Sequence, residues 1–432
     1  MSPGDVAGTG ALRAKLGLRG APMENSMLLD LPSDTLIGRS RAAWSPHQPS
    51  MAATHVGDLP TRPRLPGWLV VGAAGRNAGK TEFACAIIRA FQQVHPIVGV
   101  KVTAISDGES TCPRGSEGCG VCAALEGDFQ ISEECGEQPG KDTARMLESG
   151  ARRVFWVRCR RQRMHAALQA LAPRLAPGTL VVAESNSLAQ AVEPDVFLMV
   201  KSSNSSSVKS TAAEVMPLAR RVVVAADGAF DLSPRHLTVI DGAWHLAEAS
   251  AAILAGGTSS RMGRDKSLLP VSGSPLIHHI YEQLLARFDD LLISTNEPEK
   301  YAFLGARTVA DRFPGKGPLM GIVSAVEAAR HERVFVTACD IPVIDLDTVA
   351  RMLVLAEDFD CVIPLSSVGH EPLFAVYRKS AVPAMRDVLE AGERRISAVF
   401  PRVRTRFYDL GRAPWYRNLN TQEDFAAFVA AR

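Results

Sequence analysis

Short runs of apolar residues recur along most of this chain, and stretches of helical character separate them. The runs WLVV, IVGVKVTAI, TLVVAE and VFLMVK, the first of which starts at Trp68, do not alternate apolar with polar residues. Such a run is typical of a strand that is buried on both faces. Strands of this kind separated by helices indicate a parallel sheet that is covered by helices on both sides. The pattern therefore predicts a fold of the α/β class.

The alternation falls into two series, which we interpret as two domains. In the first series, RRVFWVRC and RVVVAA are further strand candidates, and KTEFACAIIRAFQQV, DTARMLESGA and HAALQALAPRLA are helix candidates. The second series begins near Ala249 and contains the strand candidates AAILAG, DLLIST, RVFVTA and DCVIPL. The segment DGAWHLAEAS, from Asp241, is the expected junction. We predict domains over residues 66–245 and 246–432, after a disordered tail over residues 1–65 that is rich in Gly, Pro, Ser and Arg.

The overall composition excludes several classes of protein. The chain has 48 basic and 46 acidic residues and a formal net charge of +2, which does not predict binding to nucleic acid or to a membrane surface. We expect no spanning helix, which needs about 18 apolar residues, and no secretory signal. Eight cysteines among 432 residues are not a disulfide scaffold, so we expect a cytoplasmic protein.

A glycine-rich loop follows the first strand candidate of the second series. Residues 254–266 read LAGGTSSRMGRDK, so the run AAIL leads directly into Gly256 and Gly257. Two glycines let the backbone approach a phosphate, and their amides can point at the anion. The cations Arg261 and Lys266 suit a triphosphate, because displacement at the α-phosphorus develops charge on the leaving pyrophosphate. We predict these two cations to be catalytic. The nucleotide-binding residues predicted in this loop are Leu254, Ala255, Gly256, Gly257 and Lys266.

An acidic residue ends the strand candidate RVFVTA, where the sequence reads TACDIP up to Asp340 and beyond. The carboxyl end of a parallel strand faces the crevice in which open α/β sheets bind ligands. A carboxylate there suits Mg²⁺, which prefers a few carboxylates together with phosphates and water. We predict that Asp340 is a catalytic Mg²⁺ ligand, and the alternative is that it caps the next turn.

These segments resemble the signature LAGG-xxx-RMG-x-DK of the nucleotide-triphosphate transferases, and in particular the molybdenum cofactor guanylyltransferases. The resemblance extends from about Ser250 to Arg432. It implies a Rossmann-like domain that transfers GMP from GTP to molybdenum-bound molybdopterin and releases pyrophosphate, with Mg²⁺ as cofactor. It also implies nucleotide contacts at Asn296 in STNEPEKY and at Asp311 and Gly317 in DRFPGKGPLMGI.

The same resemblance indicates where the cofactor precursor binds. EAGERRI, and RNLNT with Asn418 and Asn420, match segments near the family's precursor pocket. GHEPLFAVY resembles the substrate loop at His370, but Glu371 and Leu373 depart from it. LAGG, GPLMG and AGERR favour GTP. The alternatives are a CTP-dependent molybdopterin cytidylyltransferase and a sugar-1-phosphate nucleotidylyltransferase.

The first series carries a second phosphate-loop pattern. AGRNAGKT, residues 74–81, has P-loop spacing with Ala in place of the first Gly, and it joins the run WLVVGA to the helix candidate KTEFACAIIRAF. Loop amides and the helix N-terminus would hold phosphates, Lys80 would reach the β/γ oxygens and Thr81 would bind Mg²⁺. The alternative is a plain glycine-rich turn. The nucleotide-binding residues predicted here are Gly75, Gly79, Lys80 and Thr81.

This half resembles the molybdopterin-guanine dinucleotide biosynthesis adaptor, a small GTP-binding protein. The matching pieces are the P-loop, VKVT and PGKDTARMLESGARRV, and Glu184 falls where the family has Glu-Gly, with Ser185 in place of the Gly. The resemblance implies a P-loop NTPase-like sheet that binds GTP, with molybdopterin and either apo-molybdoenzymes or molybdenum insertion proteins as partners. The non-catalytic alternative for the whole chain is a GTP-binding adaptor that delivers cofactor.

Four cysteines form the pattern C-x6-C-x2-C-x12-C at Cys112, Cys119, Cys122 and Cys135. Four thiolates with one C-x2-C pair predict a zinc site or an iron–sulfur cluster, and the alternative is a set of unpaired loop thiols. The other cysteines lie in apolar runs and are expected in the core; they are Cys85, Cys159, Cys339 and Cys361.

Overall fold

The computed structural model describes residues 62–105, 125–136, 140–205, 208–256 and 265–431. Residues 59–432 form one compact unit, in which the described residues build two eight-stranded sheets. The predicted tail lies almost wholly outside the described residues, although β1 begins at Arg64, within its last residues.

The first sheet is parallel except at its two edges. In sheet order its strands are β3 (Phe129–Glu133), β4 (Arg153–Arg160), β2 (Ile97–Ile105), β5 (Leu180–Glu184), β1 (Arg64–Ala73), β6 (Glu193–Ser202), β7 (Arg221–Ala226) and β8 (Ala229–Phe230). The edge strands β3 and β8 pair antiparallel, and all other pairs are parallel. The strands predicted for the first series are all present, and only the short edge strands were missed.

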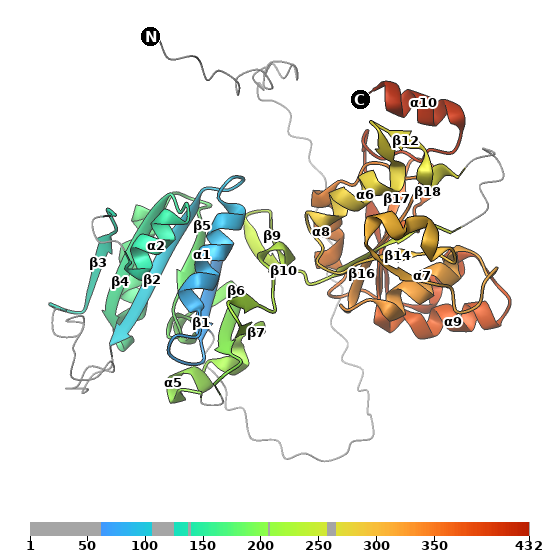
Figure 1. Ribbon diagram of the computed structural model, residues 1–432. Helices are drawn as coiled ribbons and strands as arrows, with labels where there is room; N and C mark the ends of the chain where they lie inside the picture. Colours follow the sequence, from blue (N-terminus) through green and yellow to red (C-terminus); the bar gives the residue numbers. More distant parts are fainter. Residues whose placement is uncertain (1–61, 106–124, 137–139, 206–207, 257–264, 432) are drawn as a thin grey trace, which may run out of the picture. The chain divides into compact units, whose positions relative to one another are not determined.

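Helices cover both faces of this sheet, as the lack of alternation predicts (Figure 1). Leu69 and Val71 of β1 pack into a core with α1, whereas Trp68 and Val70 pack into a second core with α3 on the opposite face. The helices are α1 (Lys80–Phe91), α2 (Asp142–Glu148), α3 (Met164–Leu171), α4 (Leu188–Ala191) and α5 (Ser210–Ala213), with 3₁₀ turns η1 (Arg161–Arg163), η2 (Ala172–Arg174), η3 (Met216–Leu218) and η4 (Pro234–His236).

A β-hairpin occupies part of the predicted junction. Strands β9 (Leu237–Ile240) and β10 (Ala243–Leu246) pair antiparallel through a turn in which Asp241 and Gly242 have φ values of 52° and 77°. Two left-handed residues in a row are what a tight hairpin turn needs, and Asp-Gly supplies them at low cost. The hairpin packs through Trp244 into the core that also contains α1.

Replacing Trp244 by Ala is expected to lower the free energy of unfolding by about 3–5 kcal/mol, the usual cost of deleting a large buried aromatic side chain. Trp244 is 1% exposed, its ring lies 4.9 Å from that of Phe91, and its indole Nε1 donates to Gly67 O over 3.2 Å. Urea unfolding measures the loss. Val94→Ala is the control, because Val94 is 76% exposed and should cost under about 0.5 kcal/mol. Equal midpoints for both variants would contradict the packing role of Trp244.

The second sheet is mixed. In sheet order its strands are β15 (Arg307–Val309), β14 (Leu291–Ser294), β11 (Ser250–Leu254), β16 (Arg333–Ala338), β19 (Phe374–Arg378), β17 (Cys361–Ser366) and β18 (Gly369–His370), with β20 (Thr405–Asp409) beside β17. β15, β14, β11 and β16 are parallel, as predicted, but β19 runs antiparallel between β16 and β17. The prediction of a parallel sheet is therefore wrong at β19 and at the short β18, neither of which was predicted as a strand.

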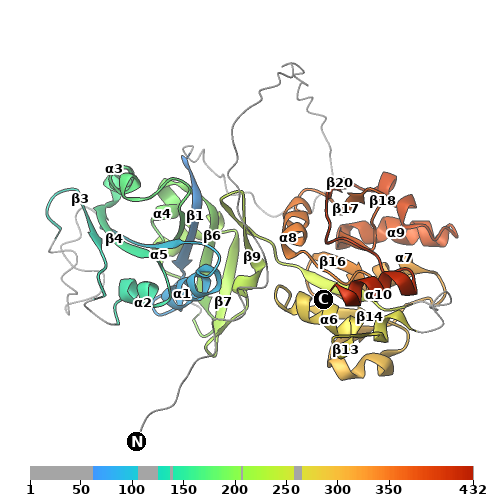
Figure 2. The same cartoon turned by 90° about the horizontal axis from the view of Figure 1, so that it is seen from above.

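Two helical layers enclose the second sheet (Figures 1 and 2). Side chains of α6 and α8 join one buried core, and those of α7 and α9 join the other. The helices are α6 (Leu276–Leu285), α7 (Pro318–Ala328), α8 (Leu346–Leu355), α9 (Val382–Glu390) and α10 (Gln422–Ala430). The remaining short elements are the pair β12 (Pro270–Val271) and β13 (Ser274–Pro275), and the 3₁₀ turns η5 (Lys266–Leu268), η6 (Pro298–Leu304), η7 (Lys379–Ala381), η8 (Ile396–Ala398) and η9 (Phe400–Arg402).

The strand order of the second sheet indicates where a ligand would bind. From β11 the chain adds β14 and β15 on one side and then returns to add β16 on the other. The order reverses between β11 and β16, and open α/β sheets bind ligands at the carboxyl ends of the strands at such a point. Among the described residues, no helix has the length and apolar character needed to cross a membrane.

Candidate active site

The glycine loop leaves the sheet at this reversal point. Ala255 is fixed at the end of β11, because its N–H donates to Ser294 O over 2.9 Å and its carbonyl accepts from the Tyr301 hydroxyl over 3.2 Å. Gly256 is exposed, and a Cβ built on it would have no atom of the described residues within 4 Å. A ligand can therefore approach this backbone. The predicted residues Gly257 and Arg261 lie outside the described residues.

Lys266 connects three segments that are far apart in the sequence. Its Nζ donates to Leu419 O over 2.9 Å, and the Leu419 N–H donates to Asp340 O over 2.8 Å. The end of the glycine loop, the end of β16 and the segment around residues 418–420 therefore meet at one place. The structure thus brings Lys266 and Asp340 together, as the predicted site requires.

Asp340 follows β16 and is half-buried. Burial raises the pKa of the Asp340 carboxyl above its ordinary value, the Lys266 ammonium opposes that rise, and the Glu371 carboxylate adds to it. A divalent cation would stabilise the ionised form of a carboxylate that is dehydrated and close to a second carboxylate. The position fits Mg²⁺ in its donor chemistry. The following helix α8 is capped by Asp345, whose carboxylate accepts from Thr348 N over 2.7 Å, so Asp340 does not serve as its cap.

Asn296 and Asp311 form a reciprocal pair beyond β14 and β15. The Asn296 side-chain amide donates to the Asp311 carboxylate over 3.0 Å, and the Asp311 N–H donates to Asn296 Oδ1 over 2.8 Å. Gly321 in α7 lies close by, since a Cβ there would come within 3.6 Å of Asp311 Oδ1. Gly317 caps α7 at φ 81°, a conformation that favours glycine, and is exposed. Asn296 and Asp311 therefore lie beside the end of β11, since a Cβ at Gly321 would also come within 3.6 Å of Leu254.

Several polar side chains lie near Asp340, and the sequence predicted only some of them. Glu371 is buried and accepts from the Ser366 hydroxyl over 2.6 Å. Tyr416 Oη and Asn418 Oδ1 are buried and make no hydrogen bond of regular geometry among the described residues, although Tyr416 lies close to Glu371 and Asn418. Burial and the neighbouring Glu371 carboxylate raise the pKa of Tyr416. Buried polar atoms without partners call for water or a ligand. The sequence pointed to Asn418 by resemblance, but nothing in RAPWYRN distinguished Tyr416.

The P-loop pattern of the first half joins β1 to α1, as predicted. Gly79 caps α1 at φ 87°, and Gly75 faces open space. Lys80 Nζ lies 2.9 Å from Glu184 Oε1, and the Thr81 hydroxyl donates to Glu184 Oε2 over 2.6 Å. The Glu184 side chain is 2% exposed and ends β5, the neighbour of β1. The loop thus presents a lysine and a hydroxyl that are both anchored to one buried carboxylate.

Most of the predicted cysteine site lies outside the residues that the structure describes. Cys112, Cys119 and Cys122 lie outside the described residues, and Cys135 is exposed. The zinc or iron–sulfur assignment stays a prediction. The other cysteines follow the expectation closely: Cys85, Cys159 and Cys361 are buried and Cys339 is half-buried.

Residues 251–405 match the family model of the MobA-like NTP transferase domain. A probable molybdenum cofactor guanylyltransferase of Carboxydothermus hydrogenoformans is 36% identical over 183 residues, which are 41% of this chain and 92% of the relative. The molybdenum cofactor guanylyltransferase of Vibrio cholerae is 32% identical over 188 residues, 43% of this chain and 93% of the relative. Among solved structures, molybdopterin-guanine dinucleotide biosynthesis protein A of Archaeoglobus fulgidus is 22% identical with a TM-score of 0.38, and the match covers 42% of this chain and 97% of that one.

Proposed function

This chain belongs to the molybdenum cofactor guanylyltransferase family through its C-terminal half, and we infer that it transfers GMP from GTP to molybdenum-bound molybdopterin. It is a nucleotidyltransferase. We assign the reacting groups from one observation. Hydrogen bonds connect Lys266, Leu419 and Asp340 at the point where the strand order reverses.

The proposed reaction needs positioned charges more than it needs a strong base. The terminal phosphate oxygen of molybdopterin attacks the α-phosphorus of GTP, the α–β phosphoanhydride bond breaks, and the electron pair leaves with pyrophosphate. That phosphate is already an anionic nucleophile. Catalysis then rests on alignment and on stabilising the charge that develops on the leaving group. Lys266 would bind phosphate oxygens, and Gly256 would let them approach the backbone.

The predicted Mg²⁺ would be held by Asp340. When bound, the ion would neutralise triphosphate charge and favour loss of pyrophosphate. Asp340 is suited to this role because its carboxylate is dehydrated and close to Glu371.

We further propose that the Asn296–Asp311 pair contributes to the choice of nucleotide. The reciprocal hydrogen bonds hold the Asp311 carboxylate in place beside the end of β11. Guanine presents N1–H and N2–H₂ donors side by side, and a fixed carboxylate can accept from both. Cytosine lacks that pair of donors. The arrangement therefore favours GTP over CTP.

The test is to incubate the full chain with Mg²⁺, each of the four ribonucleoside triphosphates and either molybdopterin or a sugar 1-phosphate as acceptor, and to resolve products by mass. The expected result is a guanine dinucleotide and pyrophosphate from GTP alone. A cytosine dinucleotide would assign the chain to the cytidylyltransferases. Turnover only with a sugar 1-phosphate would move the acceptor to another class. Absence of any product with all acceptors would favour a cofactor-delivery adaptor.

For the first half, we propose a P-loop domain that binds GTP and resembles the cofactor biosynthesis adaptor. Support comes from the anchoring of Lys80 and Thr81 to Glu184 and from the open space at Gly75. A buried carboxylate beside a lysine and a hydroxyl is suited to a nucleotide phosphate with its Mg²⁺. Apo-molybdoenzymes or molybdenum insertion proteins are the proposed recipients of the cofactor.

Replacing Lys80 by Ala is expected to weaken GTP binding to the first half by about 10–100-fold, the value of a hydrogen bond to a charged group. GMP transfer at saturating GTP should stay within about twofold, because Lys266 and Asp340 belong to the other sheet. Equilibrium binding of a fluorescent GTP analogue, in a chain whose second site is blocked by Lys266→Met, measures the first effect. Arg89→Ala is the control, since Arg89 lies in the last turn of the same helix, away from the loop, although its guanidinium pairs with Glu82 of the first turn. Loss of transfer in Lys80→Ala would instead show that the two sites are obligatorily coupled.

A further inference from the structure

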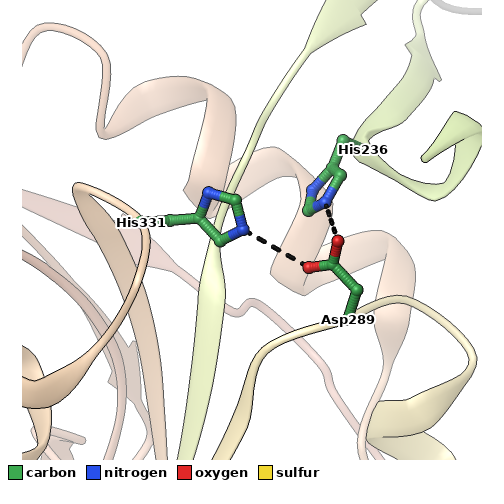
Figure 3. A group of neighbouring side chains, drawn as sticks. All are labelled: His236, Asp289 and His331. Carbon is green, nitrogen blue, oxygen red and sulfur yellow. Dashed lines mark hydrogen bonds and ion pairs between the residues drawn. The ribbon is translucent and has the colours of Figure 1, made fainter. Parts of the chain in front are cut away.

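Two histidines and an aspartate converge on one another (Figure 3). His236 Nε2 lies 3.1 Å from Asp289 Oδ2, and His331 Nε2 lies 3.3 Å from Asp289 Oδ1. One ligand atom from each of the three residues lies within 4.8 Å of the other two. His236 ends η4, Asp289 precedes β14 and His331 precedes β16.

We propose that His236, Asp289 and His331 form a binding site for one Zn²⁺ ion. Zinc at about 2.0–2.1 Å from each ligand in a tetrahedron requires its ligand atoms to be about 3.3 Å from one another. The two nitrogen–oxygen separations, 3.1 and 3.3 Å, match that edge length although they involve the two different oxygens of Asp289, and one ligand atom from each residue lies within 4.8 Å of the others. Two imidazoles and one carboxylate are ligands that zinc accepts, whereas Mg²⁺ and Ca²⁺ prefer oxygen donors. The proposal is independent of the nucleotidyltransferase assignment.

The exposure of the three side chains leaves room for the fourth ligand. The His236 side chain is 3% exposed, that of His331 is 16% exposed and that of Asp289 is 36% exposed. The ion would therefore sit at the edge of the buried region, where it can enter from solvent. A water molecule can complete the tetrahedron on the side of Asp289.

The backbone around His236 is fixed by the structure itself. The His236 N–H donates to Ser233 O over 3.0 Å, and the His236 carbonyl accepts from Ala247 N over 2.8 Å. The buried Arg287 guanidinium donates to the carbonyls of Arg235 and Leu237, on either side of the histidine. Arg287 is thereby directed at backbone oxygens and holds the 3₁₀ turn that carries the first ligand.

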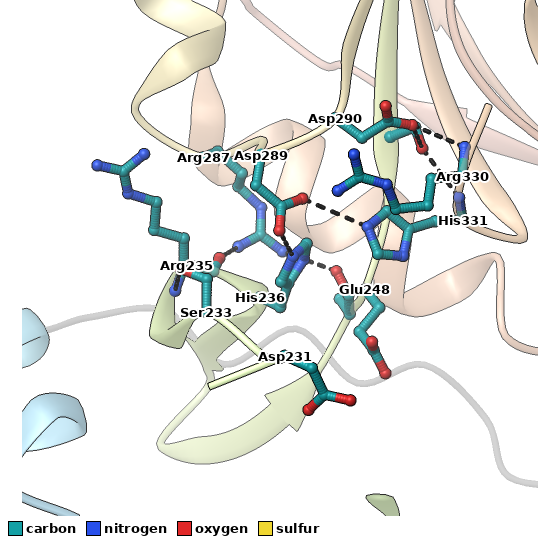
Figure 4. A network of polar contacts seen from close by, with 12 residues as sticks. Asp231, Ser233, Arg235, His236, Glu248, Arg287, Asp289, Asp290, Arg330 and His331 are labelled. Atoms are coloured by element: carbon teal, nitrogen blue, oxygen red, sulfur yellow. Dashed lines mark hydrogen bonds and ion pairs between the residues drawn. The ribbon is translucent and has the colours of Figure 1, made fainter. Parts of the chain in front are cut away.

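A second network fixes His331 (Figure 4). Its N–H donates to the Ser250 hydroxyl over 3.1 Å, and that hydroxyl donates to Asp290 over 2.5 Å. The Arg330 N–H donates to the same Asp290 oxygen over 2.7 Å. Asp290 is the direct neighbour of Asp289, so the segments that carry the second and third ligands are tied together. A site held in this way binds a metal with little reorganisation.

Binding would join elements that are distant in the sequence. The ion would link η4, which leads into the hairpin of β9 and β10, to the turns before β14 and β16. A ligand that binds only the folded chain stabilises it in proportion to the logarithm of its concentration over Kd. Zinc should therefore raise the thermal unfolding midpoint, and this effect does not depend on catalysis.

The experiment uses the full chain with Cys119→Ser and Cys122→Ser, so that the predicted cysteine site contributes no zinc. The chelator-treated protein is titrated with Zn²⁺ and, separately, with Co²⁺, in excess Mg²⁺ to occupy the Asp340 site. We expect one equivalent of Zn²⁺ and an unfolding midpoint raised by several degrees. Co²⁺ should give visible tetrahedral bands without thiolate charge-transfer absorption.

In this background, His236→Gln and His331→Gln should each weaken Zn²⁺ binding by at least about 100-fold, since even partners of a metal ligand are worth about 10–100-fold. His278→Gln is the matched control, because His278 pairs with Glu282 over 3.8 Å on α6 and should leave binding unchanged. Because the His331 side chain is more exposed than that of His236, its variant keeps the test informative if the His236 variant fails to fold. Absence of zinc binding, or equal affinity in His331→Gln and His278→Gln, would overturn the site and leave Asp289 as a carboxylate bonded to two imidazoles.

Discussion

Asp340→Asn is expected to lower the rate of GMP transfer by at least about 1000-fold while the chain stays folded. A bound divalent ion supplies several kcal/mol of transition-state stabilisation, and each 1.4 kcal/mol corresponds to about tenfold in rate. Asn preserves the size of the side chain but removes the charge that would hold the metal. Asp340 already pays a desolvation penalty in the folded chain, as its raised pKa indicates. The neutral variant should therefore be no less stable than the parent.

The matched control for this experiment is Asp345→Asn. Asp345 belongs to the same segment but caps α8, and asparagine caps a helix about as well as aspartate does. Pyrophosphate release is measured for both variants over a range of Mg²⁺ concentrations, together with thermal unfolding. The expected result is loss of turnover in Asp340→Asn alone, with unchanged unfolding in both. Full activity of Asp340→Asn at saturating Mg²⁺ would remove the metal role from this residue.

The strand prediction succeeded where burial on both faces leaves a clear pattern. TLVVAE became β5, all of whose residues are buried, and AAIL became most of β11. β19 was missed, although FAVYR is also largely buried, because it lies within a segment interpreted as a substrate loop. Its antiparallel direction follows from the turns on either side. No pattern within five residues specifies direction.

The contacts that assemble the candidate site are long-range, which explains why resemblance to a family located residues that physical reasoning could not. Lys266 and Leu419 lie 153 positions apart, and a backbone carbonyl has no sequence signature. Glu371 stood out in the sequence only as a departure from the family. In the structure it is a buried neighbour of Asp340, bonded to Ser366. A carboxylate at position 371 adds negative charge beside Asp340, and sequence comparison alone does not reveal this effect.

The first half gives the opposite lesson. P-loop spacing predicted the strand and the start of α1, because these are local features, and Gly79 in the loop has the left-handed conformation that favours glycine. Glu184 was noted as an acidic strand end, and the pairing of β5 with β1 places it against Lys80 and Thr81. The His236–Asp289–His331 group had no sequence signal, since its members come from three separate turns and no two of them share a motif spacing.

Lys266→Met is expected to lower kcat/KM for GTP by about 100–1000-fold, the range found when one fixed donor to a developing charge is removed. A lysine that contacts the triphosphate in both the ground state and the transition state should raise KM and lower kcat together. Lys266→Arg should recover part of the loss, because the charge is kept while the compact ammonium is replaced by a planar fork. Steady-state kinetics of the three proteins separate these effects.

The control must account for the bond from Lys266 to Leu419 O, whose loss alone could disturb the segment that carries Asn418. Lys379 provides this control, because its Nζ also donates to a backbone carbonyl, that of Ala329, over 2.6 Å in the same half of the chain. Lys379→Met removes an equivalent lysine–carbonyl bond away from the glycine loop and should leave kcat/KM within about twofold. If Lys266→Met and Lys379→Met lose only stability, and by similar amounts, Lys266 is a structural residue. A kinetic loss confined to Lys266→Met, with partial recovery in Lys266→Arg, would establish that its positive charge acts on the triphosphate.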